Sequence, residues 1–243
     1  MIPKVIHYCW FSGDKKNRFI RNCIKTWKKV MPDYEIRCWD ANSFDFDSVP
    51  FVKQALAEKK WAFVADYIRL YALYTEGGIY LDSDVKTFKR FDTFLDNDFF
   101  IGTEPLAGGK VEVESAIMGA VKGHSYLKEC LDFYKTINFR RDNGSIYATC
   151  PKIMTNILIQ HGYVAEDREQ FLTNGVHVYP RIFFGHCFGT KPGDYYAIHY
   201  FDGSWLEIKR GRLYKFCKAN DLMGMYISLQ KLINRIRKFS NKD

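Results

Sequence analysis

The first 40 residues alternate between apolar runs and an amphipathic stretch. Residues 5–10 form a largely apolar run that predicts a buried strand, and residues 17–30 place apolar side chains at helical spacing. Residues 34–39 alternate between apolar and polar side chains, which is typical of a second strand. A strand, a helix and a strand in this order predict a parallel β-α-β unit with a right-handed crossover.

A second helix and a third strand follow later in the chain. Residues 61–76 are apolar around almost the whole helical circumference, which predicts a buried helix, and Gly77 provides its end. Residues 79–81 then predict a strand, and an Asp-Ser-Asp sequence follows at 82–84. Ligands of open α/β sheets bind outside the carboxyl ends of the strands, so these aspartates are expected at a ligand site.

The rest of the chain contains shorter hydrophobic patterns that predict further helices and strands. Further elements are expected as helices over residues 51–60, 125–134 and 152–160, a strand over 99–102, and short strands and loops over 163–202. The sequence contains no internal repeat or flexible linker. It therefore predicts one α/β domain over residues 1–221, with a mainly parallel central sheet flanked by helices, and a basic amphipathic helix within residues 222–243.

Composition narrows the class of protein. With 243 residues, 47% of them hydrophobic, the chain has enough apolar side chains for one well-packed domain. Its seven cysteines form no Cys-x-x-Cys pair, which argues against a zinc site or a disulfide framework and predicts reduced thiols. No signal peptide and no run of about 18 apolar residues are recognisable, so a cytoplasmic location is expected.

Positive charge is in excess, and part of it lies near the C-terminus. The chain has 36 Lys and Arg against 28 Asp and Glu, a net charge of +8, which favours anionic partners. Residues 222–239 place apolar side chains on one helical face and basic side chains on the others. Such a helix either binds an anionic membrane surface or packs its apolar face on the domain, and the sequence leaves both interpretations open.

The aspartates at the end of the third strand suggest a metal site. In an extended chain, residues i and i+2 point to the same side, so Asp82 and Asp84 converge. Carboxylate oxygens are the ligands that Mg²⁺ and Mn²⁺ prefer, and these ions keep open positions for substrate phosphates. The alternative is a turn in which both side chains cap backbone amides.

The helix before these aspartates carries two charged residues in an apolar setting. Asp66 and Arg69 lie at i and i+3, on one face of the helix. Buried charges are costly unless they are paired and hydrogen-bonded. One interpretation is a structural ion pair, and the other is a polar pair that faces a ligand rich in hydroxyl groups.

Two further residue types could complete a ligand site. His199 could join a metal site begun by carboxylates, although a single histidine is more often a core residue. Trp10 and Trp205 could stack on a nucleotide base or a sugar, although Trp10 could equally belong to the core. Glu114 and Asp202 are candidates for a covalent nucleophile only because they are carboxylates near the expected cleft.

These motifs together resemble glycosyltransferase family 32, the family with a sugar-binding region that contains a DXD motif. More distantly, the chain is similar to the catalytic domains of large glucosylating bacterial toxins. The resemblance is densest over residues 1–105. It is carried by residues 2–7 with Trp10, by Ala65-Asp66-x-x-Arg69 through Gly77-Gly78 to Asp84, by Thr149-Cys150-Pro151, where the family often has Thr-Gly-Pro, and by His199 with Ser204-Trp205.

The resemblance implies a GT-A-type, Rossmann-like fold and a retaining transfer from a nucleotide sugar that requires Mn²⁺ or Mg²⁺. The roles implied for individual residues are catalysis by Asp82, Asp84 and Arg69, donor-sugar binding by Asp66, Arg69 and Asp82, nucleotide binding by His7, Trp10 and Trp205, and metal binding by Asp82, Asp84 and His199. A UDP-sugar is the favoured donor. The acceptor implied is a saccharide or lipid-linked saccharide of surface polysaccharide synthesis, met at the inner face of the plasma membrane.

Two other function classes compete with this hypothesis. A phosphatase of the haloacid-dehalogenase type would use Asp82 as its nucleophile, but Lys86 stands where that family usually has Thr or Val, and Asp66 and Arg69 would have no role. A nucleic-acid-binding module would need a compact basic and aromatic motif. No such motif occurs before the last helix, so no nucleic-acid partner is expected.

Overall fold

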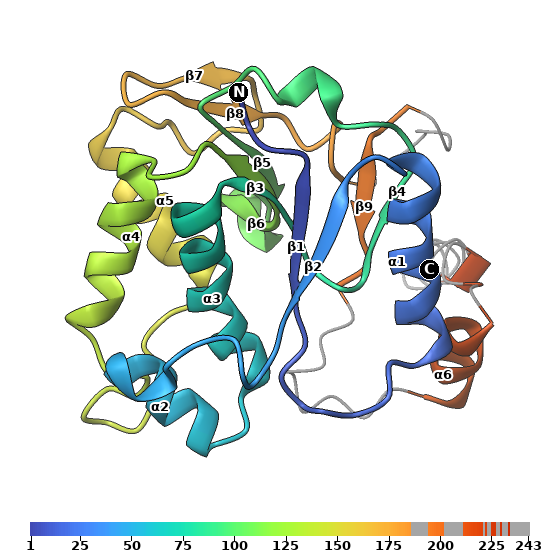
Figure 1. The fold of residues 1–243 in the computed structure, drawn as a ribbon, viewed down its shortest axis with the longest axis horizontal. Coiled ribbons are helices and arrows are strands. Elements are labelled where there is room, and N and C mark those ends of the chain that lie inside the picture. The colour runs from blue at the N-terminus through green and yellow to red at the C-terminus, as the bar shows by residue number, and fades with distance from the viewer. Residues whose placement is uncertain are drawn as a thin grey trace, which may run out of the picture.

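The computed structural model describes residues 1–185, 194–201 and 211–220, together with Leu222, Met225, Tyr226, Leu229 and Ile233. In this part of the chain, a seven-stranded sheet has the order β2-β1-β3-β6-β5-β8-β7 (Figure 1). Its strands are β1 Val5–Cys9, β2 Glu35–Trp39, β3 Gly78–Leu81, β5 Phe99–Pro105, β6 Val111–Ala120, β7 Gln170–Phe171 and β8 Val176–Tyr179.

The sheet is mixed, but most of its strands are aligned. The pairings put β2, β1, β3, β5 and β8 in one direction and β6 and β7 in the other. The expected α/β class with a mainly parallel central sheet is therefore confirmed. A separate antiparallel pair joins β4 Val85–Thr87 to β9 Ala197–His199.

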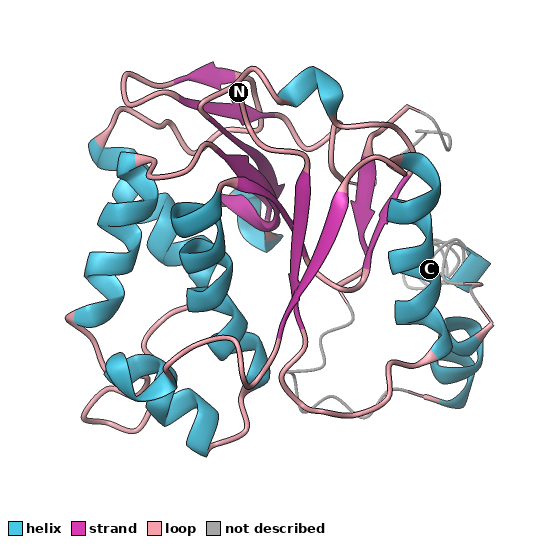
Figure 2. Cartoon of the chain, viewed as in Figure 1, coloured by secondary structure: helices cyan, strands magenta, loops and turns pink. Residues whose placement is uncertain are grey.

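Helices cover both sides of the sheet (Figure 2). Figure 1 shows α3, α4 and α5 on one side, and α1 with α6 on the other. The α-helices are α1 Arg18–Val30, α2 Pro50–Ala57, α3 Trp61–Glu76, α4 Ser125–Lys135, α5 Cys150–Gln160 and α6 Arg212–Ala219, and single 3₁₀ turns are η1 Phe46–Ser48, η2 Asp92–Phe94 and η3 Ala107–Gly109. Among the described residues, no helix is long and apolar enough to cross a membrane.

Helix α1 follows directly from the local sequence. The side chain of Asn17 accepts a hydrogen bond from the backbone N–H of Ile20 at 3.0 Å, which caps the first turn. The apolar face then buries Phe19 and Cys23 in a cluster with Tyr214 and Cys217 of α6, and Trp27 in a cluster that includes Tyr8 of β1. The helix expected over residues 17–30 is thus confirmed, with Asn17 as its cap.

Helix α3 and the turn after it position the aspartates. The helix spans residues 61–76, as the sequence predicts, and ends at Gly77, whose φ of 71° is rarely adopted by other residues. Gly78 has a φ of 109°, and a Cβ there would lie 2.7 Å from the carbonyl oxygen of Val5. The two glycines therefore let β3 begin immediately after the helix, which brings Asp82 to the carboxyl end of the sheet.

Strand β6 was not expected from the sequence. Its first half, Val-Glu-Val-Glu, alternates, but every side chain of its second half is buried, on both faces of the sheet. Without alternation, that half has no strand signal of its own. The predicted helix over residues 222–239 lies almost entirely outside the described residues.

Candidate active site

A cavity of about 780 Å³ opens at the carboxyl ends of β1 and β3. Its walls come from segments far apart in the sequence. They include the loop after β1, one face of α3, the Asp-Ser-Asp turn, strand β6, the start of α5, and His199 at the end of β9. This is the edge of an α/β sheet at which ligands are expected to bind.

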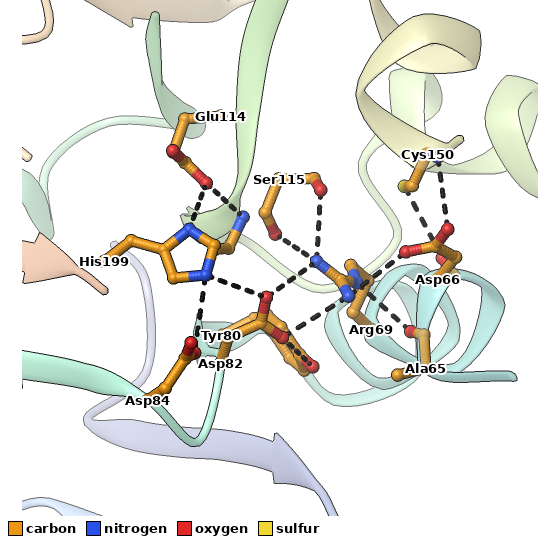
Figure 3. Close-up of polar contacts among 11 residues, drawn as sticks. Ala65, Asp66, Arg69, Tyr80, Asp82, Asp84, Glu114, Ser115, Cys150 and His199 are labelled. Atoms are coloured by element: carbon orange, nitrogen blue, oxygen red, sulfur yellow. Dashed lines mark hydrogen bonds and ion pairs between the residues drawn. The ribbon is translucent and has the colours of Figure 1, made fainter. Parts of the chain in front are cut away.

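Asp82, Asp84 and His199 form a cluster in this cavity that is suited to a metal ion. The ligand atoms of the three side chains all lie within 4.8 Å of one another. The Nε2 atom of His199 is 3.3 Å from Asp84 Oδ1 and 3.9 Å from Asp82 Oδ2 (Figure 3). Two carboxylates and one imidazole are an appropriate donor set for Mn²⁺ or Mg²⁺, so the residues present fit such an ion.

The pairing of β4 with β9 brings His199 to the aspartates. Val85, which follows Asp84, pairs directly with His199. Burial lowers the pKa of His199, but the nearby carboxylates of Asp84 and Glu114 outweigh burial and raise it well above its ordinary value. The same negative charge that favours a protonated imidazole favours a bound cation.

Arg69 connects the cluster to helix α3. Its guanidinium contacts Asp66 Oδ1 at 3.1 Å and Asp82 Oδ1 at 3.3 Å. It also donates to the carbonyl oxygen and the hydroxyl of Ser115, at 2.9 and 3.0 Å, and to the carbonyl oxygen of Ala65 at 3.2 Å. The structural ion pair between Asp66 and Arg69 is therefore present, and its arginine extends to the DXD motif.

Asp66 links α3 to the start of α5. Its Oδ2 atom accepts a hydrogen bond from the backbone N–H of Cys150 at 3.2 Å, in the first turn of α5. Burial raises the pKa of Asp66 to about 6, although Arg69 opposes the shift. A buried carboxylate at a helix N-terminus is favourably placed relative to the helix dipole. The Thr149-Cys150-Pro151 sequence thus lies beside the site.

Asp82 lies between Arg69 and His199, another member of the cluster. The hydroxyl of Tyr80 donates to its Oδ1 atom at 2.9 Å. The guanidinium of Arg69 also lies 4.9 Å from the centre of the Tyr80 ring. Asp82 is consequently held by protein contacts on one side and faces His199 on the other. This arrangement cannot be predicted from the sequence, in which Tyr80 has the pattern of an ordinary core residue.

His7 lies in the core and does not line the cavity, contrary to its expected role in nucleotide binding. Its Nε2 atom is 2.8 Å from the carbonyl oxygen of Gly77 and must donate to it, while Nδ1 accepts from the indole N–H of Trp39 at 3.1 Å. Both ring nitrogens are therefore used, and burial lowers the pKa of His7. The histidine instead joins β1 to the end of α3.

Trp10 does line the cavity, beside the loop after β1. Its indole N–H donates to the carbonyl oxygen of Asp14 at 2.7 Å, and the ammonium of Lys16 lies 5.0 Å from its ring centre. This position is compatible with the expected nucleotide contact. Trp205 and Asp202 lie outside the described residues.

The sequence suggests Glu114 only as a candidate nucleophile and does not single out Ser115. In the structure Glu114 Oε1 accepts from the backbone N–H of Ala116 at 3.0 Å and lies 3.2 Å from Nδ1 of His199. Ser115 holds Arg69, as described above. The position of both residues depends on β6, which is not among the strands predicted from the sequence.

Comparisons with known proteins agree with this geometry. Residues 18–101 match the family described as "Glycosyltransferase sugar-binding region containing DXD motif". Inositol phosphoceramide mannosyltransferase 3 of Schizosaccharomyces pombe is 28% identical over 142 residues, which cover 52% of this chain and 35% of that protein. The glycosyltransferase L373 of Acanthamoeba polyphaga mimivirus is 28% identical over 133 residues, 51% of this chain and 52% of that protein.

A solved structure shows the same fold. The galactosyltransferase LgtC, in complex with donor and acceptor sugar analogues, superposes with a TM-score of 0.50 at 13% identity, and the match covers 91% of this chain and 95% of that one. The chain spans between about a third and a half of the length of the curated relatives it matches. None of these matches supports the phosphatase alternative. The fold is of the GT-A type, and over residues 18–101 the chain is similar to the glycosyltransferases whose sugar-binding region contains a DXD motif.

Proposed function

We propose that this chain transfers a hexose or N-acetylhexosamine from a nucleotide sugar, with a UDP-sugar favoured, to a saccharide or lipid-linked saccharide. The transfer retains the anomeric configuration and requires Mn²⁺ or Mg²⁺. The observation that carries the proposal is the presence in one cavity of the Asp82, Asp84 and His199 cluster, which is suited to a metal ion, and of the Asp66–Arg69 pair. The family match and the GT-A fold support the same activity.

Asp82, Asp84 and His199 would hold the cation. Bound there, a divalent ion neutralises the negative charge that develops on the diphosphate leaving group. The residues alone are poorly suited to a diphosphate, because Asp82, Asp84 and Glu114 make this end of the cavity acidic. A cation therefore explains how an acidic site accepts an anionic donor.

Asp66, Arg69 and Asp82 would bind the donor sugar. Asp66 and Arg69 of α3 both line the cavity, but the guanidinium of Arg69 already donates to Asp66, Asp82 and Ser115. Its main contribution is therefore to fix the directions of the two carboxylates, which can accept hydrogen bonds from sugar hydroxyls. Trp10, and Trp205 by family resemblance, would contact the nucleotide.

The surface of helix α6 bears on the location of the enzyme. We propose a cytoplasmic enzyme of surface polysaccharide synthesis that binds the inner face of the plasma membrane through residues 222–239. The neighbouring helix α6 supports this location, because Leu213 and Phe216 are 49% and 60% exposed on a helix that also carries basic residues. Exposed apolar and basic side chains together favour an anionic lipid surface.

A panel of nucleotide sugars tests the proposal. We expect slow, Mn²⁺-dependent hydrolysis of one donor in the absence of an acceptor, and thermal stabilisation by the same donor with Mn²⁺. Chelation by EDTA should remove both effects, and release of phosphate from a generic aryl phosphate should be absent. Absence of any donor effect across the panel, in a folded protein with Mn²⁺ present, would contradict the proposal.

A further inference from the structure

Strand β6 is irregular where it passes the active site. Ile101 of β5 pairs with Met118, but the next residue, Gly102, pairs with Glu114. A regular antiparallel register would pair Gly102 with residue 117. Three residues of β6, at 115–117, therefore have no partner on β5, and the strand bulges at this point.

The bulge lets consecutive residues of β6 serve the same cavity. In a regular strand, successive side chains point to opposite faces of the sheet. Here Glu114 and Ser115 both line the cavity, and Ser115 holds the guanidinium of Arg69. The carbonyl oxygen of Ala116 accepts the backbone N–H of Asp82 at 2.9 Å, which fixes the start of the DXD turn.

Glu114 is itself held in place by this backbone. It is only 6% exposed, and its Oε1 atom accepts the N–H of Ala116 at 3.0 Å. The same oxygen lies 3.2 Å from Nδ1 of His199, while Nε2 of His199 faces Asp84 at 3.3 Å. The two ring nitrogens thus have different surroundings, with a fixed carboxylate at one and the metal cluster at the other.

We propose that Glu114 is a positioning residue, which accepts the Nδ1–H of His199 and so directs the Nε2 lone pair towards the metal ion. The inference rests on the proposed metal-dependent function. Histidine ligands of metal ions commonly donate their second N–H to a carboxylate, which fixes the tautomer and the ring orientation. A carboxylate held by the bulge can do this without contact with the donor or the acceptor.

This role differs from that of a covalent nucleophile. A nucleophile needs a free oxygen directed at the sugar, and its removal abolishes turnover at any metal concentration. A positioning carboxylate acts on the metal site instead, so its loss weakens metal binding by about 10–100-fold. Turnover should then recover substantially when Mn²⁺ is raised to saturation.

The test measures Mn²⁺ binding directly, by electron paramagnetic resonance of free Mn²⁺ in the presence of UDP. We expect Glu114→Ala to weaken binding by about 10–100-fold. Glu114→Gln should fall between this variant and the unmodified protein, because its amide oxygen can still accept from Nδ1–H. Glu112→Ala is the matched control, since Glu112 lies on the same strand and also lines the cavity. In the described part of the chain, Glu112 makes an ion pair with Lys152 and none with His199. This variant should bind Mn²⁺ within about two-fold of the unmodified protein.

Different outcomes separate this inference from the proposed function. Mn²⁺ affinity unchanged in Glu114→Ala would overturn the positioning role, as would loss of turnover at saturating Mn²⁺ with normal Mn²⁺ affinity. If Glu114→Ala does not fold, judged by circular dichroism, Glu114→Gln decides by the same criteria. Failure of the unmodified protein to bind Mn²⁺ would instead refute the metal site itself.

Discussion

Replacement of Arg69 by alanine should destabilise the protein strongly, because this arginine compensates two carboxylates. The side chains of Arg69 and Asp66 are only 5% and 10% exposed, and Asp82 is 23% exposed. Removal of one partner from a buried ion pair costs about 3–5 kcal/mol, since it leaves a charge buried without compensation. That loss is a large part of the roughly 5–15 kcal/mol that stabilises a typical domain.

The loss is measured by equilibrium unfolding in urea, with a surface arginine as the control. Arg140 pairs with Glu58, and their side chains are 42% and 34% exposed, so Arg140→Ala should cost less than about 1 kcal/mol. In the double variant Asp66→Asn/Arg69→Ala, the loss of free energy of unfolding should be smaller than the sum of the losses in the two single variants. The neutral amide of Asn at position 66 does not require the guanidinium to compensate a buried charge. A free energy of unfolding for Arg69→Ala within about 1 kcal/mol of the unmodified protein would refute the reasoning.

Three further predictions concern the glycine turn, the core histidine and the surface. Gly78→Ala should lower the free energy of unfolding by about 1–3 kcal/mol, because φ is 109° and the new Cβ would approach the Val5 carbonyl; a stability equal to that of the unmodified protein in thermal unfolding would contradict this. His7→Leu should lower the free energy of unfolding by about 1–3 kcal/mol for each hydrogen-bond partner that it leaves unpaired. The affinity of the folded protein for the nucleotide sugar should not change. Weakened binding of the nucleotide sugar with unchanged stability would support a role of His7 in nucleotide binding. Phe216→Glu should reduce sedimentation with phosphatidylserine vesicles, whereas Phe171→Glu, at a similarly exposed position on β7, should not; equal effects would exclude α6 as the membrane contact.

The parts of the site that could be predicted from the sequence are those with local signals. Helix α3 spans 16 residues without interruption, and the two glycines after it need positive φ angles. Asp82 and Asp84 follow a short apolar strand, so their place at the end of the sheet needed no tertiary information. The helical pattern and the glycines that end it lie within one continuous segment. A periodic pattern of this length predicts a helix and its end without information from the rest of the chain.

The parts that could not be predicted depend on contacts between distant segments. His7 has the same local sequence whether it binds a nucleotide or the Gly77 carbonyl, and only the packing of α3 against β1 decides between them. Glu114 reaches His199 because β6 bulges between two other strands. His199 is only one possible further ligand from the sequence, because the pairing that brings it to the aspartates joins it to Val85, more than one hundred residues away.

The central claim is that Asp84 helps to hold the cation that sugar transfer requires. The most direct test is Mn²⁺-dependent hydrolysis of the preferred nucleotide sugar by Asp84→Asn, beside the surface control Asp132→Asn. We expect Asp84→Asn to keep the circular dichroism spectrum of the unmodified protein and to lose at least about 100-fold in activity, because a neutral amide is a much weaker ligand for a hard cation. Asp132→Asn should remain fully active. Near-normal activity of folded Asp84→Asn at the same Mn²⁺ concentration would contradict the metal assignment.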